Sequence, residues 1–199
     1  MPRSAGGSLD DAVAALGRGE VVAVATDTVY GLVCDPANAE AVDRVFAIKR
    51  RPADLELTLL AAAATDLEDL VGWNDAARGL ATAFWPGPLS LVLPRGVRRL
   101  AIPRHGGTLS VRVPGHAAIT DLLRRSGPLA STSANRHGAP PALSAAAVRR
   151  AFGAEVAAVV EGGRPGGMAS TIIDCSVTPP RILRDGPIDS RRLRGLVQG

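Results

Sequence analysis

Short apolar runs and amphipathic segments alternate along the whole chain. Val21 to Ala25 is continuously apolar and rich in valine, which predicts a buried strand followed by a polar turn over Thr26 to Gly31. Similar runs predict strands at 57–63, 89–93, 109–113, 128–130, 156–160, 170–174 and 181–184. Apolar residues on one side predict helices at 8–16, 38–48, 74–84, 115–125 and 144–152, and a last short helix after Asp189. Residues suited to N-capping, Ser8, Asn38 and Ser144, begin three of these helices.

This mixture of strands and helices predicts an α/β or mixed α+β fold with one twisted sheet and flanking helices. No internal repeat and no long linker divides the sequence. The glycine-rich stretch Gly162 to Gly167 is too short to separate domains. We therefore expect one domain over residues 8–190, with flexible ends at 1–7 and 191–199.

Composition excludes several classes of protein. The chain has 199 residues, of which 46% are hydrophobic and 21% charged, which argues against intrinsic disorder. No apolar stretch reaches the roughly 20 residues of a membrane span, and Met1 to Asp10 lacks the apolar segment of a secretory signal. Two cysteines, Cys34 and Cys175, provide neither a disulfide framework nor a zinc motif. A soluble cytoplasmic protein without membrane association is expected.

The positive charge comes almost entirely from arginine. The formal net charge is +4, and the sequence contains 22 Arg against a single Lys, Lys49. A basic balance favours anionic partners such as nucleotide or RNA. Only six aromatic residues are present, so a platform for stacking single-stranded bases is poorly supplied.

Common nucleotide and hydrolase motifs are missing. A GxxxxGK[ST] loop is excluded because the only lysine follows Ile48, and neither GxGxxG at a strand-to-helix turn nor GxSxG occurs. The three histidines, His105, His116 and His137, fall in expected loops or at a helix start, where surface histidines are common.

Lys49 is the most informative single residue. In a chain this rich in arginine, a lysine indicates a place that needs a compact ammonium group with three donors. A charge at the end of the helix 38–48 is the alternative explanation. Lys49, Arg50 and Arg51 together are typical of an anion site.

Polar residues also gather where strands begin or end. They occupy 26–28, 110–112, 131–135 and 170–174, and Arg184 belongs to the same group. Ordinary turns are the alternative explanation for 26–28 and 131–135, and an edge-strand salt bridge is the alternative for Arg112. Plain strand ends are the alternative for 170–174 and Arg184. Because ligands of α/β sheets bind where strand ends converge, the set as a whole favours a small-molecule site that accepts anions.

These motifs also carry a family resemblance. TDTVYGL, Lys49-Arg50-Arg51-Pro52, FWPGPLSLVL, SVRVP, STSAN and STIID occur in the order typical of YrdC-type threonylcarbamoyl-adenylate synthases. The likeness runs from about Gly19 to Ile188. It implies a twisted mixed sheet around a large basic cavity, in the short, single-domain form of the family.

The resemblance implies a nucleotidyltransferase reaction. L-threonine, bicarbonate and ATP, with Mg²⁺ accompanying ATP, would give threonylcarbamoyl-AMP and pyrophosphate. A separate complex would pass the threonylcarbamoyl group to tRNA, and tRNA or double-stranded RNA is a further possible partner. No metal ligand from the protein is implied.

The resemblance also implies roles for individual residues. Threonine would be held by Thr28, Arg112, Ser131 and Ser170. ATP would be held by Arg51, Thr108, Ser133, Asn135 and Arg184. Lys49 and Arg51 would be catalytic, with Lys49 beside the reacting carbamate and phosphate.

The sequence departs from the family pattern at four places. Ala25 replaces a usual Pro, Leu55-Glu56 replaces a polar-Pro pair, Leu60 stands where many members have a His, and Pro141 stands where a Ser or Thr is frequent. Two alternative functions follow. One is a non-catalytic protein of the same fold that binds double-stranded RNA or the ribosome. The other is a related carbamoyl-adenylate enzyme, like the YrdC-type domain of hydrogenase maturation factors.

Overall fold

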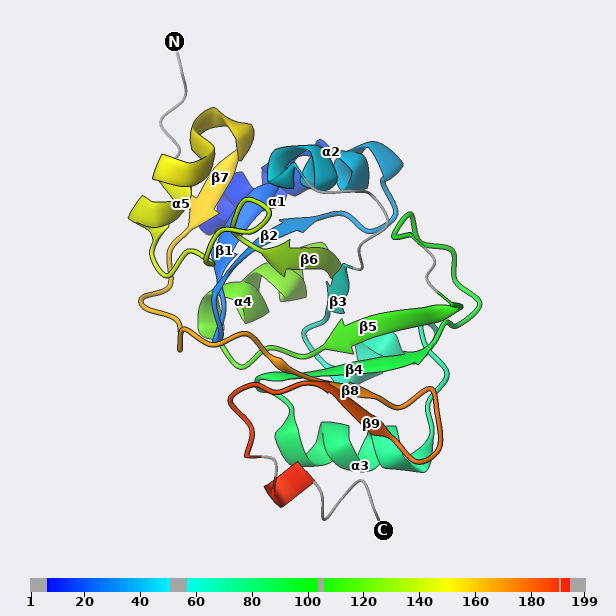
Figure 1. The fold of residues 1–199 in the computed structure, drawn as a ribbon. Coiled ribbons are helices and arrows are strands. Elements are labelled where there is room, and N and C mark those ends of the chain that lie inside the picture. The colour runs from blue at the N-terminus through cyan, green and yellow to red at the C-terminus, as the bar shows by residue number, and fades with distance from the viewer. Residues whose placement is uncertain (1–6, 51–56, 104–105, 190, 194–199) are drawn as a thin grey trace.

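A single mixed sheet organises the molecule (Figure 1). The computed structural model describes residues 7–50, 57–103, 106–189 and 191–193, and over these residues the sheet has nine strands. The strands are β1 (Val22–Ala25), β2 (Tyr30–Cys34), β3 (Thr58–Leu60), β4 (Leu89–Pro94), β5 (Thr108–Arg112), β6 (Leu129–Ser133), β7 (Ala158–Val160), β8 (Thr171–Asp174) and β9 (Arg181–Arg184). The prediction of a mixed α/β fold with one sheet is confirmed.

The spatial order of the strands differs strongly from their order in the chain. It runs β7-β1-β2-β6-β3-β5-β4-β8-β9. The β7–β1, β3–β5 and β4–β8 pairs are parallel, and the other neighbours are antiparallel. Distant segments therefore meet in the sheet: Thr58 is paired with both Ser110 and Ser131.

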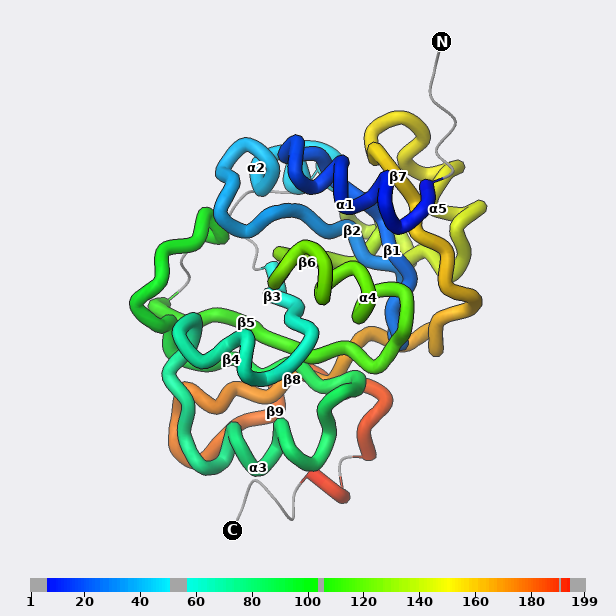
Figure 2. Tube along the Cα trace, turned by 180° about the vertical axis from the view of Figure 1, so that it is seen from behind, coloured from blue at the N-terminus to red at the C-terminus, as the bar shows by residue number. Residues whose placement is uncertain are grey.

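Helices cover the two faces of the sheet unequally. The larger core packs α2 (Ala39–Lys49), α3 (Asp75–Phe84) and α5 (Ala145–Phe152) against one face. On the other face, α1 (Leu9–Gly17) and α4 (Ala117–Ser126) cover β7, β1 and part of β2 (Figure 2). None of the described helices is long and apolar enough to cross a membrane.

The helices begin where their capping residues predict. The Ser8, Asn38, Asn74 and Ser144 side chains each accept a hydrogen bond from the backbone amide three residues later. Ser8 and Asp11 form a complete capping box. α4 differs, because His116 is its N-cap and accepts from the Ala118 amide.

Three details of the expected secondary structure are wrong. The polar turn is shorter than expected, because Tyr30–Cys34 forms β2 and pairs with β1 from Ala25↔Tyr30 to Val22↔Val33. All five β2 residues are buried, so the strand shows no alternation of polar and apolar residues. Ser131 to Ser133 lie within β6 rather than beyond its end. β3 ends at Leu60, and a 3₁₀ helix follows at Ala64–Leu67.

The ends of the expected domain are only partly described. Residues 1–6 and 194–199 lie outside the described part of the chain. Residues 191–193 are helical, and Leu193 is buried in the larger core. The limits 8–190 stay a prediction.

Candidate functional site

A cavity of about 570 Å³ lies on the same face of the sheet as α1 and α4, over the strands that these two helices do not cover. On three central strands, the residues that alternate with core residues line it: Thr58 and Leu60 on β3, Ser110 and Arg112 on β5, and Ser131 and Ser133 on β6. The intervening Leu59 on β3 and Val111 on β5 are fully buried in the larger core, whereas the intervening Thr132 on β6 also lines the cavity. The remaining wall consists of Thr26, Thr28, Val29, Gly31, Ser90, Val92, Thr132, Pro141, Ala169, Ser170, Ile172, Leu183 and Arg184.

The turn between β1 and β2 is held by the buried Thr26 side chain. Its Oγ1 donates to Val29 O (2.6 Å) and accepts from the backbone amides of Thr28 (3.2 Å) and Val29 (3.3 Å). It also lies 3.0 Å from Thr28 Oγ1. These bonds fix Asp27 and Thr28 at the edge of the cavity.

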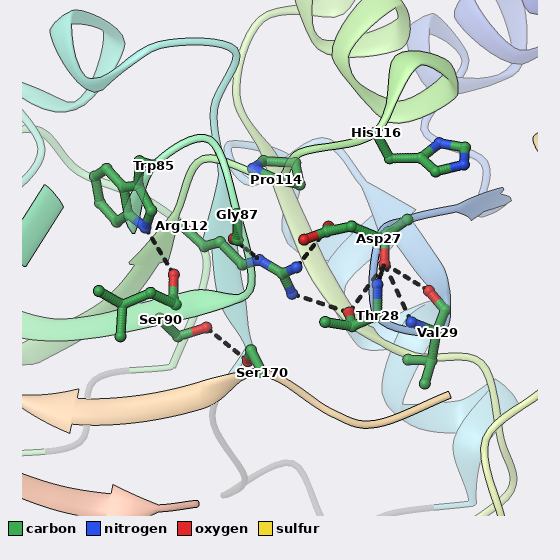
Figure 3. A network of polar contacts seen from close by, with 12 residues as sticks. Asp27, Thr28, Val29, Trp85, Gly87, Ser90, Arg112, Pro114, His116 and Ser170 are labelled. Atoms are coloured by element: carbon green, nitrogen blue, oxygen red, sulfur yellow. Dashed lines mark hydrogen bonds and ion pairs between the residues drawn. The ribbon is translucent and has the colours of Figure 1, made fainter. Parts of the chain in front are cut away.

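Arg112 connects this turn to β5 (Figure 3). Its side chain is only 7% exposed and donates to Asp27 Oδ1 (2.6 Å), Thr28 Oγ1 (3.0 Å) and Gly87 O (3.0 Å). Burial lowers the pKa of Arg112, and the Asp27 carboxylate opposes that shift. Within the described residues, Asp27 Oδ2 is buried and has no hydrogen-bond partner.

A second arginine approaches from the β8–β9 side. Arg184 donates to Ser170 O (3.0 Å) and Ser170 Oγ (3.1 Å), and Ser170 Oγ lies 2.9 Å from Ser90 Oγ. Burial lowers the pKa of Arg184, and the positive charge of Arg112 lowers it further. Two partly desolvated cations therefore repel each other in one cavity, and an anion bound there would relieve that repulsion.

Lys49 lies behind this wall rather than in it. It is the last residue of α2 and is 2% exposed. Its Nζ donates to Ser133 O (2.6 Å), Asn135 O (2.9 Å) and Asn135 Oδ1 (3.0 Å). Ser133 Oγ also donates to Asn135 Oδ1 (2.5 Å). The ammonium group thus fixes the segment that follows β6.

The structure brings most of the expected site residues together. Six of them line the cavity: Thr28, Arg112, Ser131, Ser133, Ser170 and Arg184. Lys49 and Asn135 contact Ser133 from behind the wall. Thr108 begins β5 two positions before Ser110 and is not in the wall, and Arg51 lies outside the described residues.

Five hydroxyl residues of the wall have no expected role: Thr26, Thr58, Ser90, Ser110 and Thr132. Of these, Thr58 and Ser90 also lie outside the polar groups that the sequence predicts. Thr58 Oγ1 and Ser110 Oγ lie 3.0 Å apart across β3 and β5. Isolated hydroxyl residues inside otherwise apolar strands are the signal that could have found them. Two departures from the family pattern, Leu60 and Pro141, also lie in the wall, so they alter the cavity itself.

A sheet that carries a hydroxyl-lined cavity with the buried Arg112 and the more exposed Arg184 is typical of a ligand-binding α/β protein for an anionic small molecule. The Sua5/YciO/YrdC family model, described as telomere recombination, matches residues 14–186, and the chain belongs to this family.

Named relatives support this membership. The threonylcarbamoyl-AMP synthase of Xanthomonas campestris pv. campestris (strain B100) is 41% identical over 189 residues, covering 90% of this chain and 95% of that protein. The threonylcarbamoyl-AMP synthase of Bacillus subtilis (strain 168) is 37% identical over 191 residues, covering 94% of this chain and 55% of that protein.

A solved structure shows the same fold. The crystal structure of P. abyssi Sua5 complexed with L-threonine has a TM-score of 0.89 and 35% identity, covering 94% of this chain and 56% of that one. This chain spans about half the length of the Bacillus and P. abyssi proteins, and nearly all of the Xanthomonas relative.

Proposed function

We propose that this protein is an L-threonylcarbamoyl-adenylate synthase, a nucleotidyltransferase that acts in the cytoplasm ahead of tRNA modification. The observation that carries the proposal is the cavity shared by Arg112 and Arg184, whose other polar groups are mainly hydroxyls. The named relatives and the threonine complex of a family member support threonine and ATP as its substrates.

The reaction passes through anions at every step. The threonine amino group attacks the carbon of bicarbonate, and loss of water gives a carbamate. A carbamate oxygen then attacks the α-phosphorus of ATP, and pyrophosphate leaves. Fixed cations and hydroxyl donors accelerate such a step by orienting the reactants and stabilising the charge that develops.

Threonine is assigned to the end of the cavity near the β1–β2 turn. Thr28, Arg112 and Ser170 present a hydroxyl, a guanidinium and a second hydroxyl there. Ser131, a residue that is 8% exposed, adds a third hydroxyl to the same wall. A carboxylate beside Arg112 and a hydroxyl beside Thr28 or Ser131 would satisfy these groups.

ATP is assigned to Ser133 and Arg184 in the wall, supported by Asn135, Thr108 and Arg51. Lys49 lies behind this part of the wall and would reach the reacting carbamate and phosphate by exchanging one of its bonds to Ser133 or Asn135. Within the described residues, no group of three or more His, Cys, Asp or Glu side chains could hold a metal ion. Mg²⁺ would accompany ATP on its phosphate oxygens, which are the hard ligands that this ion prefers.

The downstream partner is a complex that transfers the threonylcarbamoyl group to tRNA. The activity of this chain is tested directly by its products. Products formed from ATP, bicarbonate and one amino acid at a time should be analysed by mass spectrometry. Threonine should give an adenylate and stoichiometric pyrophosphate, and omission of bicarbonate is the matched control.

The competing function predicts a different result. A non-catalytic RNA-binding protein would make no adenylate with any amino acid and would bind double-stranded RNA with a steep salt dependence. That combination would overturn the proposed function. An adenylate formed from carbamoyl phosphate instead of bicarbonate would favour the related carbamoyl-adenylate enzyme.

A further inference from the structure

The loop between β7 and β8 crosses from one part of the sheet to the cavity wall. We call residues 161–169 the strap. Near its end, the Gly166 amide donates to Asp27 O (3.1 Å) and the Gly167 amide donates to Thr28 O (2.8 Å). Ala169 and the following Ser170 then enter the wall. The strap therefore holds the β1–β2 turn and delivers Ser170 to the cavity.

His116 anchors the beginning of the strap. Its Nε2 lies 2.7 Å from Gly162 O, and its Nδ1 lies 3.3 Å from the Ala118 amide nitrogen. A carbonyl oxygen can only accept and a backbone amide can only donate, so Nε2 carries the proton and Nδ1 accepts. One neutral imidazole thus joins the N-terminus of α4 to the strap.

The contact between His116 and the strap is very close. A Cβ atom built on Gly162 would lie 2.4 Å from His116 Cε1, and 2.9 Å from both Ala118 Cβ and Ala25 Cβ. Only glycine allows the strap to approach α4 and the end of β1 so closely. Figure 3 shows His116 beside the turn that carries Asp27 and Thr28.

We propose that His116 is a positioning residue for the threonine end of the cavity, an inference that rests on the proposed function. By holding Gly162, His116 fixes the path of the strap. The strap in turn holds the Asp27 and Thr28 carbonyls, and Thr28 and Asp27 orient Arg112. His116 acts on substrate binding through these contacts and touches no reacting atom.

Two substitutions separate its capping role from its role on the strap. Asparagine is a favoured N-cap, but its side chain is too short to reach Gly162. H116N should therefore keep the melting temperature near that of the wild type and raise the KM for threonine about tenfold, with a change of about twofold or less in KM for ATP. H116A should show the same rise in KM together with a lower melting temperature, because it also loses the cap.

Ser8→Ala is the matched control. It removes the N-cap of α1, whose residues take no part in the cavity wall. It should lower the melting temperature as H116A does and leave the KM for threonine unchanged. If H116N has the wild-type KM for threonine, or if Ser8→Ala raises it as much as H116A does, the proposal is overturned.

Amide hydrogen exchange tests the strap without any turnover. In H116N, the Gly166 and Gly167 amides should exchange at least about tenfold faster than in the wild type, and the Ala147 amide should be unchanged. Unchanged protection of Gly166 and Gly167 would overturn the positioning role. If the wild-type protein forms no adenylate, the proposed function fails on its own, and the exchange result still decides whether His116 holds the strap.

Discussion

Two groups of polar side chains, each built around one buried cation, differ in what their hydrogen bonds hold. The first, the arginine pair, consists of Arg112 and Arg184 in the cavity wall. The second, the lysine cluster, consists of Lys49, Ser133, Asn135 and Arg136 around the end of β6. Arg112 donates to the side chains of Asp27 and Thr28 and to one backbone carbonyl, Gly87 O, and its positive charge lowers the pKa of Arg184. Lys49 instead donates to oxygens of Ser133 and Asn135, two of them backbone carbonyls.

This difference separates a cation prepared for a ligand from a cation that maintains the wall. An anion in the cavity would relieve the repulsion between Arg112 and Arg184. The Lys49 ammonium has three acceptors already, so it can contact a reacting group only by exchanging one of them. The lysine cluster would then affect catalysis mainly through the placement of Ser133 and Asn135.

The largest effect is expected for Arg112→Ala. It removes a guanidinium from the cavity and leaves the Asp27 carboxylate, with a side chain 16% exposed, without its ion pair. Pyrophosphate release should fall by about 10²–10³-fold, and the free energy of unfolding by about 3 kcal/mol. A coupled assay measures pyrophosphate release, and urea denaturation measures the free energy of unfolding.

A double variant separates these two effects. Arg112→Met combined with Asp27→Asn removes both charges, so stability should largely return while activity stays low. Near-normal turnover in Arg112→Ala would show that the cavity cation is not needed, and the comparison between the two clusters would fail.

Lys49→Arg should have the next largest effect. A planar guanidinium cannot direct three donors at the converging oxygens of Ser133 and Asn135. Activity should fall by about 10²-fold and the melting temperature by about 3–8 °C. Steady-state kinetics and calorimetry measure the two quantities.

A thermodynamic cycle tests whether Lys49 works through Asn135. Asn135→Ala should lower activity and melting temperature as Lys49→Arg does. The variant with both substitutions should be no less stable than the less stable of the two single variants. Lys49→Arg and Arg112→Ala share no partner among the contacts described above, so their losses of stability should add. Additive losses for Lys49→Arg and Asn135→Ala would instead indicate that Lys49 acts separately from that cluster.

The sequence predicted the helices and most strands because caps and apolar runs are local signals. It missed β2 because its pattern places Tyr30 and Gly31 in the polar turn, which leaves only the three apolar residues 32–34. It also missed the wall residues Thr58 and Ser90, whose grouping depends on strand order. It identified Lys49 from composition alone but could not show that its ammonium faces backbone carbonyls. From the sequence, Lys49→Arg is expected to leave the melting temperature nearly unchanged, and the three acceptors reverse that expectation.

Ser133→Ala should have a smaller and more selective effect. Ser133 belongs to both the cavity wall and the lysine cluster, because its hydroxyl donates to Asn135 Oδ1. Loss of that hydroxyl should weaken ATP binding by about 1–3 kcal/mol, without a comparable change for threonine. Isothermal titration with each ligand measures this, and Ser131→Ala, expected to affect threonine instead, is the control. Equal effects of both variants on both ligands would contradict the division of the cavity.

The smallest effect concerns the outer support of the lysine cluster. Arg136 pairs with Glu155 and donates to Ile48 O, next to Lys49. The hydrogen bond from Arg136 lowers the pKa of Glu155 below its ordinary value of 4.5. The pair therefore stabilises the fold above pH 4.5, and this contribution disappears as the pH falls through the lowered pKa.

Glu155→Gln should accordingly cost at most about 1 kcal/mol at neutral pH, because the Glu155 side chain is exposed to solvent, which weakens the ion pair. Urea denaturation at a series of pH values should show the wild type and the variant converging in acid. If the wild type and Glu155→Gln still differ in free energy of unfolding well below pH 4.5, the charge of the Glu155 carboxylate is not the cause of that difference.

The position of β8 in the sheet also determines when, during synthesis of the chain, the cavity wall can be completed. β8 pairs with β4, although the segments that form β5, α4, β6 and α5 are synthesised between them. A nascent chain that has reached β7 already holds β4 and β5, but the edge of β4 is unpaired and Ser170, Ile172 and Arg184 are missing from the wall. Until β8 pairs with β4, the exposed backbone groups of that edge can pair with strands of other chains. The complete cavity wall can therefore form only after Arg184 has left the ribosome.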